Sequence, residues 1–352
     1  MNAFGGGIGN IDAVPAGIFD GCKPTAGSAA VVEVVKSACS KESWVALDLI
    51  GGFSFITAMF SIDEHPMWVY AMDGEYVTPQ KVEAISITNG DRYSVLVKLN
   101  NTGDFKIRVA SIGAPQILSG YGNLRVRNKG DGTTTSDGSV AYINDVGMPA
   151  TPSSVVSYFS QAIAKPYPKS PVKQTADAMF KLEMRIVGAS YRWALNNTVF
   201  TPTDFENSVP ALFRPDPKAA NNVTISTLNG TWVDLVIMST TSPMPSHPIH
   251  KHGNKMYMIG AGTGAFKYPN VAAAIAETPE SFNLVDPPRR DTFATLPALT
   301  DQAWMVVRYQ VTNPGAWLLH CHIQNHMMGG MNMIIQDGVD HWPKVPNEYK
   351  NF

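Results

Sequence analysis

The chain has 352 residues and a formal net charge of −2, with no basic run, so it lacks the electrostatic footprint of a nucleic-acid partner. No apolar stretch approaches the ~20 residues that a membrane-spanning helix needs. The low charged fraction of 16%, with 29 Gly and 25 Pro, is typical of a loop-rich β protein. The length predicts about two domains.

Residues 1–130 carry short apolar segments at regular spacing. Asp73-Gly74 and Asn89-Gly90 are typical of tight turns between strands. His65 lies in a predicted turn at residues 63–66 and is interpreted as a turn or surface histidine. The spacing predicts a first β-sandwich, with strands at residues 31–35, 53–56, 59–62, 68–71, 84–87, 93–97 and 105–109.

Residues 131–175 interrupt this pattern. A Gly-, Ser- and Thr-rich loop is followed by Pro166, Pro168 and Pro171, which predict a stiffened linker. Residues 176–352 resume the strands, at 180–186, 231–237 and 304–311, with Val233, Leu235 and Ile237 alternating onto one face of the second. Residues 271–276 predict one short helix.

The densest group of metal-binding side chains lies between His320 and Met331. A predicted buried strand enters it at residues 315–319, and a returning strand leaves it at 333–335. Because a strand alternates its faces, His320 and His322 should point to one side and Cys321 to the other. The spacing Cys321-x4-His326-x4-Met331 lets one loop surround a metal. Thiolate, imidazole and thioether, with one more histidine, are the ligands of a blue copper site.

A second histidine group lies upstream, at residues 247–252. His250 and His252 are two residues apart, so an extended backbone places both on one face. Pro248 keeps the backbone of His247 extended. The economical assignment gives His247 to the site of Cys321, His326 and Met331. A separate four-imidazole set then comprises His250, His252, His320 and His322, and Cys321 joins the two sites through one short covalent path for an electron.

Other interpretations of these residues are less specific. Structural zinc usually takes a closed set of Cys and His ligands without a thioether. Cys321 as a nucleophile lacks a supporting Ser/Asp or Asn/His arrangement. Met327, Met328 and Met333 are interpreted as soft packing around the site, with copper shuttling as the alternative.

The two motifs resemble the third and fourth copper-binding motifs of multicopper oxidases, the laccase and ascorbate oxidase superfamily. The phrases His-Pro-Ile-His-Lys-His and Leu-Leu-His-Cys-His-Ile-Gln-Asn-His, with Gly260-Ala261-Gly262-Thr263-Gly264 between them, resemble the ascomycete laccase-like branch of pigment and secondary-metabolite oxidases. The resemblance implies an all-β protein of two cupredoxin-like (plastocyanin-like) Greek-key β-sandwich domains. It implies a middle domain without copper ligands at residues 1–130, a linker at 131–175 and a C-terminal copper-binding domain at 176–352.

The resemblance also implies roles for the site residues. Electrons from a phenolic donor would enter near a solvent-exposed His326 or His247 and pass through Cys321 to His320 and His322, the catalytic residues, for reduction of O2 to water. An axial Met331, where many laccases have Leu or Phe, should lower the copper potential. The implied ligands are His247, Cys321, His326 and Met331 for type 1 copper, His250 for type 2 copper, and His252, His320 and His322 for the type 3 pair.

One departure from the family is large. Members carry two further His-x-His motifs in an N-terminal cupredoxin domain, whereas only His65 and His341 of the eight histidines here lie outside the two motifs. The chain therefore resembles the second and third domains of a three-domain oxidase, and its type 2 and type 3 sites are half-sites. We expect a missing N-terminal domain or a partner chain to supply four histidines. The alternative is a non-enzymatic blue-copper electron-transfer protein or an inactive fragment.

Cysteine usage and glycosylation sequons bear on the compartment. Sequons at Asn100, Asn196, Asn222 and Asn229 favour a secreted glycoprotein, whereas residues 1–7 lack the features of a signal peptide. We expect that a signal was lost with the N-terminus. Cys22 and Cys39 could pair with each other or bridge to another domain, and the sequence leaves both open.

Overall fold

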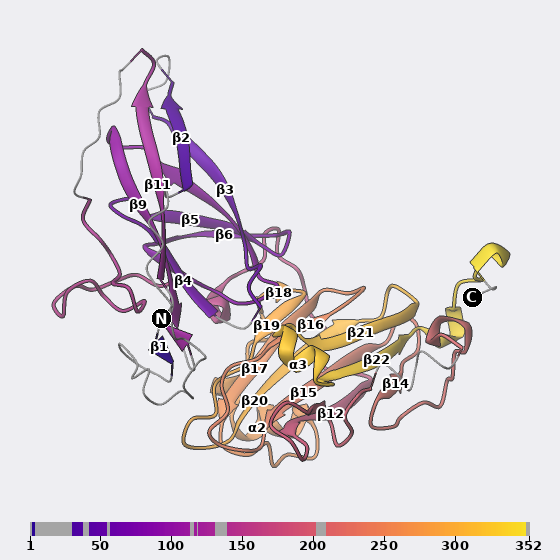
Figure 1. The fold of residues 1–352 in the computed structure, drawn as a ribbon. Coiled ribbons are helices and arrows are strands. Elements are labelled where there is room, and N and C mark those ends of the chain that lie inside the picture. Colours follow the sequence, from indigo (N-terminus) through magenta and orange to yellow (C-terminus); the bar gives the residue numbers. More distant parts are fainter. Residues whose placement is uncertain are drawn as a thin grey trace. The chain divides into compact units, whose positions relative to one another are not determined.

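The computed structural model describes residues 2–3, 30–37, 42–54, 57–112, 116–117, 119–130, 139–201 and 209–349. The chain divides into two compact units, Met1–Gln161 and Ala162–Phe352 (Figure 1). Cys22 and Cys39, whose pairing was left open, lie outside the described residues. No helix among the described residues is long and apolar enough to cross a membrane.

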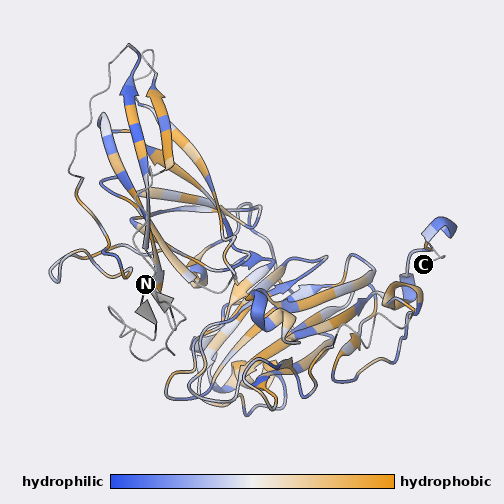
Figure 2. Cartoon of the chain, viewed as in Figure 1, coloured by the Kyte–Doolittle hydropathy of each residue, from blue (hydrophilic) through white to orange (hydrophobic). Residues whose placement is uncertain are grey.

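The first unit is built from two sheets, with strand orders β2-β11-β9-β4-β7 and β3-β8-β5-β6. Non-consecutive neighbours in each sheet give the Greek-key pattern. Exposed and half-buried residues alternate along β3, and hydrophilic and hydrophobic residues alternate along the strands in Figure 2. The strands are β2 (Ala30–Lys36), β3 (Trp44–Ile50), β4 (Thr57–Ile62), β5 (Met67–Met72), β6 (Glu75–Val82), β7 (Ala84–Ile87), β8 (Arg92–Lys98), β9 (Gly103–Ile112) and β11 (Ser119–Asn128), with a separate pair of β1 (Asn2–Ala3) and β10 (Gln116–Ile117).

Two expectations for this unit are corrected. Residues 53–54 of the strand predicted at 53–56 are not in a strand, and residues 55–56 lie outside the described part of the chain. His65 lies in the predicted turn, where its amide donates to the carbonyl of Ile62, but it is not a surface residue, since only 1% of it is exposed. Its ring packs edge-on against Phe105, and its Nδ1 lies 2.9 Å from the carbonyl oxygen of Asp63. Burial lowers the pKa of His65, so the ring is a neutral core residue.

The region between the predicted domains is shared by the two units. Ile143 is fully buried with Met59 and Ala84 of the first unit, and the amide of Phe159 donates to the carbonyl of Ala84. The division after Gln161 therefore falls inside the predicted linker 131–175. The finer domain boundaries stay a prediction.

The second unit contains a six-stranded sheet, β13-β12-β15-β20-β17-β18, and a five-stranded sheet, β14-β22-β21-β16-β19. The central strand β15 buries Val236 as well as the predicted Val233, Leu235 and Ile237, because neighbours and core cover both of its faces. The strands are β12 (Ala178–Ile186), β13 (Trp193–Leu195), β14 (Thr224–Ser226), β15 (Trp232–Ser239), β16 (Pro248–Lys251), β17 (Met256–Thr263), β18 (Arg289–Arg290), β19 (Thr292–Ala294), β20 (Ala303–Gln310), β21 (Gly315–Cys321) and β22 (Asn332–Asp337).

Short helices complete the second unit. The predicted helix is present as α2 (Val271–Glu277), and the side chain of Asn270 caps it by accepting from the amide of Ala273. A second helix, α3 (Gln324–Met328), lies between β21 and β22 (Figure 1). It was not predicted, because five residues are too few to show a helical period. The 3-10 turns are η2 (Gln161–Ile163), η3 (Ala211–Phe213), η4 (Pro279–Ser281), η5 (Val339–His341) and η6 (Asn347–Tyr349).

Candidate metal centre

The two histidine motifs lie on neighbouring antiparallel strands, β16 and β21. Their register sets His250 opposite His320, and Ile249 opposite Cys321. Residues that face each other across two strands share a side of the sheet, and the next pair along points the other way. This register therefore places His250 and His320 on one face and Cys321 on the other. Two groups of side chains thus lie on opposite faces of the β16–β21 pair.

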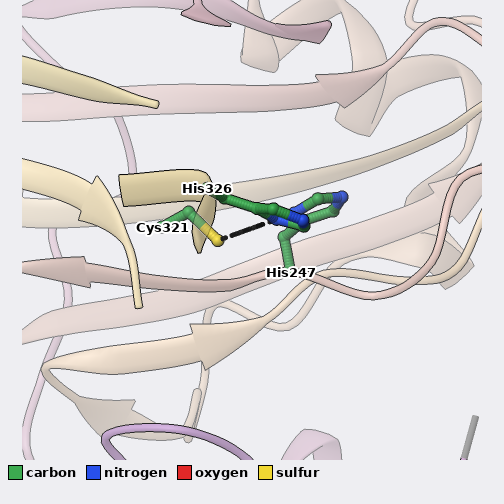
Figure 3. Close-up of side chains that lie close together, drawn as sticks. All are labelled: His247, Cys321 and His326. Atoms are coloured by element: carbon green, nitrogen blue, oxygen red, sulfur yellow. Dashed lines mark hydrogen bonds between the residues drawn. The ribbon is translucent and has the colours of Figure 1, made fainter. Parts of the chain in front are cut away.

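The thiolate cluster consists of His247, Cys321 and His326 (Figure 3). The Sγ of Cys321 lies 3.6 Å from Nδ1 of His247 and 3.8 Å from Nδ1 of His326. The two Nδ1 atoms are 3.1 Å apart. Three donor atoms thus converge on one point, and all three residues are buried. One sulfur and two imidazole nitrogens are the donor types that a blue copper takes, so the residues fit this metal.

Backbone hydrogen bonds hold the loop that carries these side chains. The amide of Cys321 donates to the carbonyl of Met331, and the amide of Met331 donates to the carbonyl of His326. Met331 is fully buried. The amide of His247 donates to Oγ1 of Thr295 at 2.9 Å, which fixes the residue before Pro248. Residues 321–331 therefore close on themselves, and Met331 is tied directly to two members of the cluster.

Burial controls the protonation of the thiolate cluster. It raises the pKa of the Cys321 thiol to about 12. It lowers the pKa of His247 to about 3, with help from the neighbouring His326, and that of His326 to about 4. Without metal, the cluster is a neutral thiol beside two neutral imidazoles. This argues against a nucleophilic role for Cys321, because only the thiolate is reactive, and copper binding would release its proton.

The imidazole cluster consists of His250, His252, His320 and His322. The Nε2 atoms of His252 and His320 are 3.2 Å apart, and the donor atoms of His250 lie in the same group. The donor atoms of His322 are not part of this group, and its ring centroid lies 5.4 Å from that of His320 and 5.7 Å from that of His250. A surface hollow borders the cluster, and it is lined in part by His250, His252, Lys255, Asp291 and Trp317.

Hydrogen bonds fix the ring tautomers of two histidines in this cluster, His320 and His250. Nδ1 of His320 lies 2.9 Å from the carbonyl oxygen of Cys321, and Nδ1 of His250 lies 3.1 Å from that of Asp291. A carbonyl can only accept, so each Nδ1 carries the proton and each Nε2 keeps a lone pair. Burial, followed by the neighbouring His250, His252 and His322, lowers the pKa of His320 to about 3. The Nε2 atoms of His320 and His250 are therefore the ring nitrogens left to bind a metal, and the His320 imidazole is neutral.

The structure corrects one expectation about access to the thiolate cluster. We expected a solvent-exposed His326 or His247, but the exposed fractions are 5% and 0%. The indole of Trp193 stacks on His326, with ring centroids 4.0 Å apart and an interplanar angle of 29°, and lies 5.3 Å from the ring of His247. A donor at the surface therefore does not meet an open histidine face.

Sequence reasoning did not find Trp193, because it lies more than fifty residues before the first histidine motif. The available signal was the Gly329-Gly330 pair just before Met331. A Cβ on Gly329 would lie 2.2 Å from the carbonyl oxygen of Tyr191, and the amide of Trp193 donates to the carbonyl of Gly329. These glycines let the backbone beside Trp193 approach the metal-binding loop closely.

The depressed histidine pKa values predict that the metal-free chain becomes less stable as the pH falls from 7.5 to 5. Folded pKa values of about 3 for His247 and His320 and about 4 for His326 lie below the ordinary 6.5. In that interval the unfolded chain binds more protons, so stability is fully present above pH 6.5 and is lost toward the folded values. Each unit of difference corresponds to about 1.4 kcal/mol.

Urea unfolding of the metal-free chain at several pH values measures this effect. The change should be nearly the same in His341→Gln, because His341 is exposed beside Asp340 and belongs to neither cluster. A midpoint that stays constant or rises on acidification would contradict the burial of three neutral imidazoles.

Comparison with known proteins agrees with this fold. Two models of the multicopper oxidase family match residues 29–129 and 194–340. The laccase ustL of Ustilaginoidea virens is 41% identical over 348 residues, which are 96% of this chain and 53% of that protein. The laccase abr2 of Aspergillus fumigatus is 37% identical over 340 residues, covering 95% of this chain and 56% of that protein.

Solved structures share the fold. The structure of Fet3p, described as a multicopper oxidase that functions in iron import, matches with a TM-score of 0.70 and 20% identity over 91% of this chain and 60% of that chain. The laccase from Botrytis aclada matches with a TM-score of 0.69 and 24% identity over 91% of this chain and 55% of that chain.

Two cupredoxin-type sandwiches, one of them carrying a buried cysteine–histidine cluster beside a four-histidine cluster, define a copper oxidase architecture. The chain belongs to the multicopper oxidase family. The predicted all-β fold of cupredoxin domains is confirmed. The chain spans about half the length of the curated relatives it matches, from 53% to 56% in these two cases.

Proposed function

We propose that this chain forms the type 1 copper site and half of the trinuclear site of a laccase-like oxidase. The observation that carries the proposal is the arrangement of two metal-type clusters about one strand pair, joined by the peptide bonds between His320, Cys321 and His322. Bound copper would supply one-electron oxidation of a donor coupled to reduction of O2 to water. Loading the folded chain with copper and recording its absorption spectrum is the direct test, and a blue band is expected.

Each of the eight proposed copper ligands has a role in this proposal. His247 and three residues of the buried loop 321–331, Cys321, His326 and Met331, hold the type 1 copper. His250 serves the type 2 site, and His252, His320 and His322 serve the type 3 pair. Cys321, His320 and His322 are also the proposed catalytic residues, because the thiolate side and the imidazole side meet at these three consecutive positions.

The donor is proposed to be a phenol of pigment or secondary metabolism, with O2 as the acceptor. The support is the similarity to proteins named laccase. A secreted glycoprotein is proposed with it, and the sequon residues Asn100 and Asn222 are exposed, as glycosylation requires.

A second candidate function is non-enzymatic electron transfer by the type 1 site alone. It is favoured by one observation: this sequence offers four imidazoles for a site that holds three coppers in the family.

In the oxidase proposal, the missing ligands come from outside this chain. His252 is exposed and the cluster borders a surface hollow, so further ligands can approach it there. We propose that a cupredoxin domain or partner chain supplies four histidines at this face.

Replacing Met331 with Leu should keep the blue band and raise the reduction potential. A weak axial thioether donates to oxidised copper, so its removal disfavours that state. A redox titration followed at the blue band measures the change.

The matched control is Met333→Leu. Met333 is equally buried, two residues further along, but its backbone is not bonded to Cys321 or His326. A potential that is unchanged or lowered in Met331→Leu, or raised equally in both variants, would count against Met331 as the axial ligand.

A further inference from the structure

A fully buried lysine separates the two histidines of the first motif. Lys251 lies between His250 and His252 in β16, and none of its surface is exposed. A buried ammonium is costly unless it is paired and hydrogen-bonded, so its presence in this position requires an explanation. It points away from the imidazoles of its two neighbours, because successive residues of a strand alternate faces.

The three donors of the Lys251 ammonium all have acceptors. Nζ lies 2.6 Å from Oδ2 of Asp337, 3.1 Å from Oδ1 of Asn254 and 3.1 Å from the carbonyl oxygen of His252. It also lies 4.5 Å from the ring centroid of Tyr309, within the range of a cation–π contact. An ammonium has three N–H groups, so this set satisfies it completely.

The ion pair between Lys251 and Asp337 spans the strand that carries the second motif. In the five-stranded sheet, β21 lies between β16 and β22, and Asp337 ends β22. The other carboxylate oxygen of Asp337 accepts from Thr227 at 2.8 Å and from Tyr309, on β20 of the other sheet, at 2.9 Å. Lys251, on β16, is therefore bonded across β21 to Asp337 of β22, and Asp337 links it to Tyr309 of the second sheet.

The other two bonds of Lys251 act on the turn that leaves His252. One holds the carbonyl of His252 itself, and the other holds the side chain of Asn254, whose amide donates to the carbonyl of Gln310. His252 lies beyond the end of β16 and is exposed, and its position depends on the bond from its amide to the carbonyl of Leu318 on β21 and on the turn that follows. Its Nε2 nevertheless meets Nε2 of His320 at 3.2 Å.

We propose that Lys251 is a positioning residue of the imidazole cluster: it holds the turn at His252 against the strands that carry His320, so that both imidazoles face one metal. This inference rests on the proposed function of the cluster. It assigns to the Lys251–Asp337–Asn254 contacts a role in metal affinity that a merely structural ion pair would not have. Supporting hydrogen bonds of this kind tune metal sites by fixing the orientation of the ligands.

Charge and positioning predict opposite effects when Lys251 is replaced by Met. A cation near a metal site repels the metal, so an electrostatic role predicts tighter binding once the charge is removed and Asp337 is left behind. A positioning role predicts weaker binding, because the turn at His252 is released. The sign of the change therefore separates the two.

The experiment titrates Cu²⁺ by calorimetry into the whole chain after its type 1 site has been filled. In Lys251→Met, we expect the affinity for the next copper to fall by about tenfold or more. The blue band should be unchanged, because no residue of the thiolate cluster contacts Lys251. Asn254→Ala, which removes one bond to the turn and keeps the ion pair, should weaken the same step less and serves if Lys251→Met does not fold.

The matched control is Arg308→Met. Arg308 and Asp234 form another buried cross-strand ion pair, with Nε–Oδ1 and Nη2–Oδ2 distances of 2.6 and 2.8 Å, and Arg308 touches no histidine. The Arg308→Met variant should have a lower thermal unfolding midpoint and an unchanged affinity for the second copper. Equal losses of affinity in the two variants, or tighter binding in Lys251→Met, would overturn the inference. If the copper-loaded wild type shows no blue band, the proposed function itself is overturned.

Discussion

Copper-loaded chain should show an intense blue absorption band, and Cys321→Ser should abolish it. The band requires charge transfer from a thiolate to copper, which a hydroxyl cannot provide. Cys321 supplies the sulfur of the thiolate cluster, with the Nδ1 atoms of His247 and His326 at 3.6 and 3.8 Å. No other domain is needed for this site, because all four proposed ligands belong to this chain. Absorption spectroscopy of folded, copper-loaded protein measures the result.

The serine variant must be shown to fold before its spectrum is interpreted. Serine is close in size to cysteine but places a hydroxyl in a fully buried position, so a lower unfolding midpoint is expected. Circular dichroism confirms the fold at the temperature of the assay. Folded wild-type protein that binds oxidised copper, Cu²⁺, and stays colourless would show that Cys321 is not a copper ligand.

Local patterns accounted for most of the fold. Asp73-Gly74 predicts a tight turn, and both residues have positive φ, 49° and 84°, between β5 and β6. Alternation located β8, β12 and β20 within one or two residues of their observed ends. The strand predicted at residues 53–56 was wrong at Phe53 and Ser54, because an apolar run shows burial but not the hydrogen-bond partners that make a strand.

The candidate site was predictable to the extent that its residues lie close together in sequence. The alternation between His320 and Cys321 is a local property, and the structure places these residues in different clusters. The contact of His247 with Cys321 was inferred by elimination across more than seventy residues. Trp193, Thr295 and the Asp337 partner of Lys251 could not be found this way, because each reaches the site through strand register and sheet packing that no local pattern encodes.

The burial of His65 shows the same limit. Its position in a turn and before Pro66 predicts exposure, whereas the carbonyl of Asp63 and the ring of Phe105 enclose it. Phe105 is forty residues away, on β9. A residue at the end of a strand can face either way, and the long-range neighbour decides.

The chain by itself should show little or no four-electron reduction of O2. Full turnover requires three coppers held close together, and this chain presents only the half-shell of His250, His252, His320 and His322. The exposed His252 leaves that half-shell open on one side. Metal bound there should exchange readily, because affinity depends on the number and the fixed geometry of the ligands.

A cupredoxin domain carrying two His-x-His motifs, fused at the N-terminus or added in trans, should restore O2 uptake with a phenolic substrate. Copper counting separates the two states: we expect about one tightly bound copper per chain alone and about four in the complete assembly, from the number of ligands available. The matched control is the same added domain with its histidines replaced by alanine, which should dock without restoring uptake. Four tight coppers and rapid O2 uptake by the lone chain would contradict the half-site. Two copies would then have to combine their imidazole clusters into one complete shell, and activity would rise steeply with chain concentration.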